Sequence, residues 1–337
     1  MGRPRVSVIV INYNYGRYLS RAVSSVLAQE VPAGGMEILV VDDGSTDDSK
    51  DRISPYLEKV RWIEKRNGGQ VSAFNTGMRE AKGEFVALLE SDDFWESTKL
   101  AQCLARLTAQ PEAAMVQHWL TQADADGNSL PGFSYPDGPT QVDLDVYLRR
   151  SLPYIGASCV VFRRAALEKH LPLPEKFLYG ADACLRLLAA TKGPILVIPK
   201  RLGTRRLHGK NLFGGTVYDD RDKLERTLKF HWDMASYHRR VLDEAGKKAP
   251  PGALEELEFE GRVMEMFLNR YRWKFPAAIA SWAKAVAVCR PFAFSVFKGA
   301  ALFIALLAPR AYLRLQGAYA RSPLHAWRRK RISAWRA

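Results

Sequence analysis

Three carboxylates and a serine follow directly on an apolar run near residue 90. The run, residues 85–89, continues into Glu90, Ser91, Asp92 and Asp93. Placing like charges so close raises the cost of ionising all of them unless a cation lies among them. Carboxylate oxygens suit Mg²⁺ or Mn²⁺, and such an ion can bridge a diphosphate. An acidic turn or a helix cap is the alternative interpretation.

Two further polar clusters follow apolar runs earlier in the chain. Asn12, Tyr13 and Asn14 end the first run, and Asp42 and Asp43 end the second. The carboxyl ends of parallel strands meet at one edge of a sheet, where ligands bind. The convergence of three clusters therefore favours a ligand site over simple capping. The nearby glycines match neither G-x-G-x-x-G nor G-x-x-x-x-G-K-[ST], so a phosphate held here needs a metal.

Alternating strands and helices are predicted to position these clusters. β-Branched runs indicate strands, and helically spaced apolar residues indicate helices. In the first part of the chain we expect strands at 5–12, 36–45, 60–65 and 84–90, and helices at 18–29, 45–57 and 71–83. This order implies a mostly parallel sheet.

The second part of the chain shows more varied patterns. We expect helices at 98–111, 143–151 and 181–193, strands at 113–119 and 194–199, a strand followed by a helix within 157–174, and a polar loop at 204–215. Charged helical patterns follow at 218–245 and 253–272.

Ordered motifs in the first third of the chain resemble those of the family 2 glycosyltransferases of the GT-A fold. The matching stretches are VSVIVINYN, AVSSVLAQ, EILVVDDGSTDDS and NGGQVSAFNTGMREAKGEFVALLESDDFW. The match covers residues 5–110 with almost no gaps and continues more weakly to residue 215. It implies an α/β, GT-A fold with a mostly parallel, Rossmann-like central sheet flanked by helices. It also implies inverting sugar transfer from a nucleotide-diphospho-sugar, with a UDP-sugar favoured.

The resemblance implies roles for the residues at the strand ends. Tyr13 would stack on the nucleotide base, Asp43 would accept hydrogen bonds from base or ribose, and Gln70 would reach the donor. The implied donor-binding set is Ile11, Asn12, Tyr13, Asp42, Asp43, Gln70, Ser91, Asp92 and Arg206. The implied ligands of Mn²⁺ or Mg²⁺ are chiefly Asp93, with Asp92 and His208. A plain turn at 67–70 and a solvated basic loop around His208 are the alternatives.

The catalytic base of the family commonly lies in a Gly-Glu-Asp stretch that opens a helix. Gly180, Ala181 and Asp182 resemble this stretch, although Ala181 replaces the Glu. Asp182 is therefore the predicted base that takes the proton from the acceptor hydroxyl. A simple helix N-cap is the alternative role.

Two more positions depart from the family pattern. Glu90 stands where relatives often carry Asp, which keeps the charge but moves it one methylene outward. Phe74 stands where many relatives carry Arg. If that Arg helps to bind phosphate, Lys65 or Arg66 is the candidate cation here.

The net charge of +14 lies in the C-terminal part of the chain. Residues 266–337 contain 14 of the 50 Lys and Arg residues and no Asp or Glu. Bases, aromatic residues and apolar residues interleave there, which suits a helix lying on an anionic membrane surface. The uncharged run 300–308 argues against nucleic-acid binding. Packing on the catalytic domain, contact with another subunit in a homo-oligomer and a single membrane span are the alternatives.

We therefore predict a GT-A catalytic domain over residues 1–215, with a nucleotide-binding half at 1–110 and an acceptor half at 111–215. A charged helical segment at 216–265 and a basic amphipathic tail at 266–337 follow. The enzyme is expected on the cytoplasmic face of the membrane, acting on a polysaccharide, lipid-linked or glycolipid acceptor. A catalytically inactive binding or assembly protein of a cell-envelope glycan pathway is the competing class.

Overall fold

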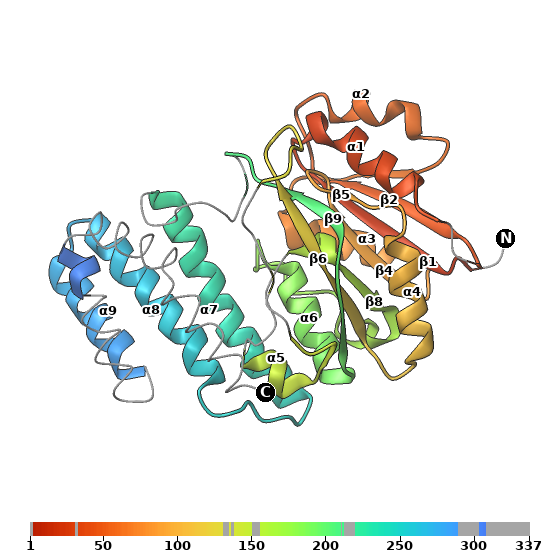
Figure 1. Ribbon diagram of the computed structural model, residues 1–337. Helices are drawn as coiled ribbons and strands as arrows, with labels where there is room; N and C mark the ends of the chain where they lie inside the picture. The colour runs from red at the N-terminus through yellow and green to blue at the C-terminus, as the bar shows by residue number, and fades with distance from the viewer. Residues whose placement is uncertain are drawn as a thin grey trace. The chain divides into compact units, whose positions relative to one another are not determined.

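The chain forms two compact units in a computed structural model. The structure describes residues 3–30, 33–130, 135, 138–149, 156–209, 211, 220–288 and 303–307. The first unit comprises Met1–Tyr147 with Leu152–Asn211, and the second comprises Leu148–Ser151 with Leu212–Ala337. Figure 1 traces both units, and each is described by itself below.

A nine-stranded mixed sheet is the centre of the first unit. Its strand order is β3-β2-β1-β4-β8-β6-β9-β5, with β7 paired to β9. The first four strands in this order are parallel: β3 (Arg61–Glu64), β2 (Met36–Asp42), β1 (Val6–Asn12) and β4 (Phe85–Glu90). The others are β8 (Val160–Arg163), β6 (Met115–Ala123), β9 (Ile195–Arg206), β5 (Phe94–Trp95) and β7 (Gln141–Val142). The α/β prediction is confirmed, and the parallel pairing predicted from the first ninety residues is found there.

The second half of the sheet mixes strand directions. Strand β8 runs antiparallel to both β4 and β6, whereas β6 and β9 are parallel. Strands β5 and β7 each pair antiparallel with β9. The sheet therefore departs from a wholly parallel arrangement only beyond β4.

Helices cover both faces of the sheet because the strands are apolar on both sides (Figure 1). One face, carrying Val8 and Val10, forms a core with apolar residues of α1 (Gly16–Leu27) and α4 (Lys99–Ala109). On the other face, α3 (Gln70–Glu80) approaches β1 so closely that a Cβ on Gly77 would lie 2.5 Å from a methyl group of Ile9. The remaining helices of this unit are α2 (Ser49–Ile53), α5 (Leu144–Leu148) and α6 (Ala181–Lys192).

Two predicted elements of the first unit differ from the structure. The helix expected after β8 is only a pair of 3₁₀ turns, Arg164–Ala166 and Glu168–His170, ahead of two prolines. The loop expected from residue 204 begins later, because β9 continues to Arg206. Cross-strand pairing extends it: Thr204 pairs with both Phe94 and Thr121. This extension carries residues 204–206 to the edge of the carboxylate cluster.

The second unit is helical in its described part. Helices α7 (Arg221–Glu244), α8 (Ala253–Tyr271) and α9 (Phe275–Val288) are followed by helical residues at 303–307. Their core includes Leu224, Met266 and Phe267. The charged helices predicted at 218–245 and 253–272 are found as α7 and α8. Among the described helices, none combines the length and apolar character needed to cross a bilayer.

The division at residue 265 stays a prediction, and α8 continues across that position. Most of the predicted tail, residues 289–302 and 308–337, lies outside the described residues.

Candidate active site

The ends of β1 and β2 are joined by buried side chains. Asn12 and Asp42 are cross-strand partners, and Asn12 Nδ2 donates to Asp42 Oδ1 at 2.7 Å and to Ser49 Oγ at 2.9 Å. Asp42 also accepts from the backbone N–H of Ser45 at 2.8 Å and from its hydroxyl at 2.6 Å. These two predicted donor-binding residues thus fix the loops after β1 and β2. Tyr13, the next residue, has 46% of its surface exposed.

Asp43 organises the Asn-Gly-Gly turn. Its carboxylate accepts from Lys65 Nζ at 2.6 Å and from the backbone N–H groups of Gly68 and Gly69 at 3.0 and 2.8 Å. Gly69 has φ +84, which an L-residue rarely adopts, so the turn depends on glycine there. Lys65 therefore already neutralises Asp43. This pairing competes with the phosphate role suggested for Lys65 from the sequence.

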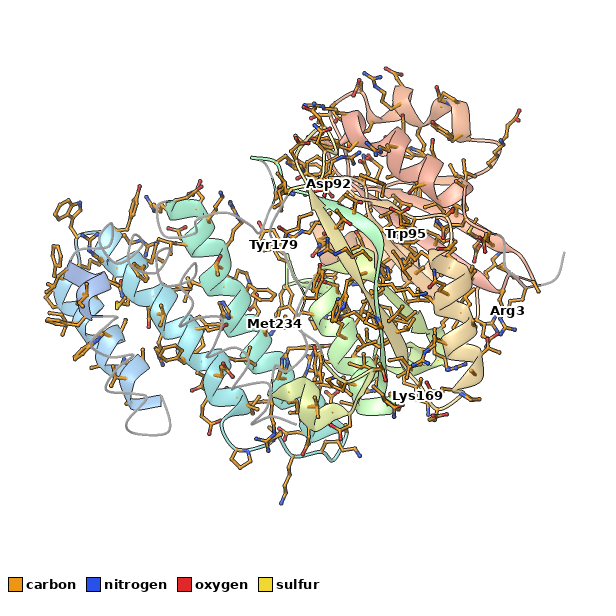
Figure 2. The ribbon with its side chains drawn as sticks, in the orientation of Figure 1. Arg3, Asp92, Trp95, Lys169, Tyr179 and Met234 are labelled. Atoms are coloured by element: carbon orange, nitrogen blue, oxygen red, sulfur yellow. The ribbon has the colours of Figure 1, made fainter. Side chains whose placement is uncertain are left out.

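The predicted metal-binding acids form one cluster at the end of β4. Glu90, Asp92 and Asp93 each offer a carboxylate oxygen, and these oxygens all lie within 4.8 Å of one another. Figure 2 labels Asp92 at this end of the sheet. Asp92 and Asp93 are 7% and 1% exposed, so the cluster is shielded from bulk water. Ser91 is buried beside them.

Burial and crowding perturb the cluster. Burial, with the neighbouring Asp92 carboxylate, raises the pKa of Asp93 to about 7. Burial, followed by Asp92, Asp93 and Asp182, raises the pKa of Glu90 well above its ordinary value. Placing a divalent cation among these oxygens would relieve the repulsion. The three acids supply hard oxygen ligands, so their chemistry fits Mn²⁺ or Mg²⁺.

Ser158, just before β8, is hydrogen-bonded to two residues of the cluster. Its hydroxyl donates to Asp93 Oδ2 at 2.6 Å and accepts from the backbone N–H of Glu90 at 3.1 Å. Its backbone oxygen accepts from the indole N–H of Trp95 at 2.8 Å. Sequence reasoning missed Ser158, because no local pattern shows that residues 158 and 93 meet.

Residues at and just after the end of β9 also contact Asp92 and Asp93. His208 Nε2 lies 3.0 Å from Asp92 Oδ2, and Asn211 Nδ2 donates to the same oxygen at 3.2 Å. The backbone N–H of Arg206 donates to Asp93 Oδ1 at 3.0 Å. His208 thus lies beside the cluster, and its role as a metal ligand stays a prediction.

Arg206 and Arg205 face different surroundings. The Arg206 guanidinium donates to the backbone oxygen of Asp92 at 2.5 Å and lies over the rings of Tyr18 and Phe94, so it holds the loop rather than facing open space. Arg205 also acts on the acids, because its charge opposes the rise in the pKa values of Glu90 and Asp93. Alternation along β9 separates the two side chains. Arg205 is a site residue that the sequence analysis did not single out.

Asp182 lies in the first turn of α6 and is 2% exposed. Its charge is among those that raise the pKa of Glu90, which places it electrostatically with the cluster. Gln70, at the start of α3, joins the two regions through hydrogen bonds to Glu90 and Gly180. Phe74 and Ala181, the departures from the family pattern, are fully buried.

An α/β sheet of this topology, with an acidic cluster at the carboxyl end of β4, defines a GT-A protein. The family model for glycosyl transferase family 2 matches residues 7–171. Residues 7–171 therefore form a domain of the family 2 glycosyltransferases.

Several known proteins are similar to part of this sequence. An uncharacterized glycosyltransferase of Nostoc sp. is 38% identical over 215 residues, covering 61% of this chain and 66% of that protein. Chondroitin synthase of Escherichia coli is 29% identical, covering 62% of this chain and 30% of the synthase. The chain therefore matches just under two thirds of the first relative and less than a third of the second.

Solved structures share the fold. Residues 1–349 of Staphylococcus aureus TarS in complex with UDP-GlcNAc align with a TM-score of 0.59 and 18% identity, covering 85% of this chain and 82% of that one. The mannosyltransferase PcManGT of Pyrobaculum calidifontis, in complex with GDP-Man and Mn²⁺, aligns with a TM-score of 0.53 and 22% identity, covering 95% and 87%.

Proposed function

We propose that this glycosyltransferase moves a sugar, with inversion, from a nucleotide-diphospho-sugar to a polysaccharide, lipid-linked or glycolipid acceptor. The observation that carries the proposal is the buried cluster of Glu90, Asp92 and Asp93, electrostatically linked to Asp182. A UDP-sugar is the favoured donor, consistent with the TarS complex with UDP-GlcNAc. A GDP-sugar is the alternative, because PcManGT was solved with GDP-Man.

Donor binding is assigned to the carboxyl ends of β1, β2 and β4. The exposed ring of Tyr13 is available for stacking on the base, and Ile11, two residues earlier, is half-buried. Asp43 offers further acceptor capacity to base or ribose, because each carboxylate oxygen can accept two hydrogen bonds. Arg205, whose charge acts on Glu90 and Asp93, is assigned to the diphosphate in preference to Arg206, whose guanidinium is held by the backbone oxygen of Asp92.

Asp93 and Asp92, with Glu90 beside them, would hold Mn²⁺ or Mg²⁺. When bound, the divalent cation supplies Lewis-acid stabilisation of the leaving diphosphate. His208 is assigned to the orientation of Asp92, through their 3.0 Å contact, or to the ion directly. Ser158 keeps one Asp93 oxygen oriented by its hydrogen bond.

Asp182 is assigned as the general base. Its carboxylate takes the proton as the acceptor oxygen forms a bond to the anomeric carbon, and the bond from that carbon to the diphosphate oxygen breaks. Attack from the opposite face inverts the anomeric centre.

The assignment is tested with Asp93→Asn and Asp182→Asn, both nearly isosteric. We expect each to abolish transfer, and only Asp93→Asn to weaken metal-dependent donor binding. Donor binding is measured by thermal stabilisation in a screen of nucleotide-sugars with and without Mn²⁺. Near-normal turnover of Asp182→Asn would show that another group is the base. If no donor is hydrolysed or transferred with Mn²⁺ present, the inactive binding or assembly protein becomes the better description.

We also propose that the second unit contacts the anionic cytoplasmic face of the membrane. Trp273 is 81% exposed in the turn between α8 and α9, and Tyr271, Phe275 and Ile279 are 47%, 41% and 49% exposed. Basic residues accompany these side chains, and no acidic residue follows position 265. Apolar anchors among bases are typical of an interfacial surface. The alternative is that another subunit covers this surface.

Flotation of the full chain with vesicles tests this surface. We expect binding to vesicles that contain phosphatidylglycerol, weaker binding to phosphatidylcholine alone, and loss on Trp273→Ser with Ile279→Ser. Leu57→Ser, which changes a 50% exposed side chain of the first unit, is the control. Unchanged flotation of the double variant would exclude this surface, and a concentration-dependent dimer that the variant abolishes would favour the subunit contact.

A further inference from the structure

Helix α3 is hydrogen-bonded to the segment that precedes α6. Asn75 Nδ2 donates to the backbone oxygen of Leu173 at 2.8 Å, and Asn75 Oδ1 accepts from the backbone N–H of Leu173 at 2.8 Å. One turn earlier, Ser72 Oγ donates to Glu175 Oε1 at 3.3 Å. The face of α3 that carries these side chains therefore guides the chain toward α6.

Gln70 makes the last contact of this series and reaches in two directions. Its Oε1 accepts from the backbone N–H of Gly180 at 3.0 Å, and its Nε2 donates to Glu90 Oε1 at 3.1 Å. Gly180 precedes α6 in the left-handed conformation, with φ +84, and Asp182 follows two residues later. One amide group thus joins the carboxylate cluster to the start of the helix that carries Asp182.

The chemistry of the amide fixes its orientation. Only the carbonyl oxygen of Gln70 can accept from the N–H of Gly180, and only its NH₂ group can donate to Glu90. Because a glycine precedes α6, no side chain at that position can cap the helix. The placement of this helix start therefore depends on groups outside it, and Gln70 is one of them.

We propose that Gln70 is a positioning residue that couples the position of the Glu90 carboxylate to the position of the start of α6. A divalent cation held by the cluster would compete with the Gln70 NH₂ group for the Glu90 oxygens. A shift of that carboxylate moves the Gln70 amide, and with it the Gly180 N–H. Loading of the donor site thereby adjusts Asp182. This inference rests on the metal site of the proposed function. It adds that occupation of the metal site precedes the final placement of Asp182.

Hydrogen exchange of the full chain tests the proposal, with Mn²⁺ alone as the probe. In the wild type, Mn²⁺ is expected to change exchange severalfold both in residues 85–95 and in residues 178–188. In Gln70→Met, which keeps the side-chain length but has no amide, only residues 85–95 should respond. Gln70→Asn, too short to reach both partners, should behave like Gln70→Met. Ser72→Ala, one contact further along α3, is the control and should respond as the wild type does.

The outcomes separate two failures. If the wild type shows no Mn²⁺ response in either segment, the metal site of the proposed function is wrong, and the positioning role falls with it. If residues 85–95 respond but 178–188 do not, or if both segments still respond in the two Gln70 variants, only the positioning role is overturned. Melting temperatures show whether each variant is folded, so loss of response in a folded Gln70 variant supports the proposal.

Discussion

Replacing Lys99 by methionine is expected to stabilise the first unit at and below neutral pH. Lys99 is fully buried at the start of α4, and its Nζ has no hydrogen-bond partner among the described residues. The ammonium lies over the Trp95 ring, 3.1 Å from the centroid. The positive end of the α4 dipole also disfavours a cation there. Methionine keeps an unbranched chain without the charge.

The expected magnitude follows from the pKa of Lys99. Burial lowers this pKa from 10.5 to about 7, which corresponds to a charging cost on the order of 5 kcal/mol. This cost sets the expected gain from Lys99→Met at pH 6.5, on the order of 5 kcal/mol in the free energy of unfolding.

The pH dependence has a definite sign. Between the folded pKa of about 7 and the unfolded value of 10.5, the unfolded chain binds more protons than the folded chain. The wild type therefore gains stability as the pH rises through this window, and its deficit relative to Lys99→Met shrinks. Below about pH 7 the deficit is complete and constant.

Urea titrations read by hydrogen exchange in β4 report the stability of the first unit alone. Wild type and Lys99→Met are compared at pH 6.5 and pH 9.5, with Lys59→Met, an exposed lysine, as the control. A variant that is no more stable than wild type at pH 6.5, or a gain equal at both pH values, would refute the reasoning. Either result would mean that a group near Lys99 compensates its charge.

Three further substitutions probe the site. Ser158→Ala removes a hydrogen bond to a carboxylate and should cost about 1.5–3 kcal/mol, seen as Mn²⁺ affinity reduced at least tenfold in calorimetry while Ser158→Thr retains most of it. Tyr13→Ala should weaken nucleotide binding by about 1–3 kcal/mol, whereas Tyr13→Phe should not. Gly69→Ala should destabilise by about 1–2 kcal/mol and more than Gly35→Ala, because both have positive φ but only Gly69 would place a Cβ 3.2 Å from the Leu178 oxygen. Equal costs for the two glycines in urea unfolding would contradict this contact.

The sequence predicted the first half of the fold well, because its signals are local. Apolar runs that end in Asn12, Asp42 and Glu90 mark the strand ends, and short connections leave parallel pairing as the sensible topology. The second half was harder to predict. Strand β9 extends to Arg206 through pairing with β5 and β6, which are distant in sequence, and no local pattern encodes that pairing.

The sequence by itself determined the family, the acids at the end of β4 and the charge imbalance between residues 1–265 and 266–337. These are properties of residue type and spacing along the chain. Only the tertiary structure decided which side chains become hydrogen-bond or charge partners. In the folded chain Asn12 donates to Asp42, and Ser158 donates to Asp93. The charge of Arg205 acts on Asp93. The Gln70 amide bonds to both Glu90 and Gly180. Hydrogen bonds are short-ranged and directional, so such pairings exist only once distant segments are packed together.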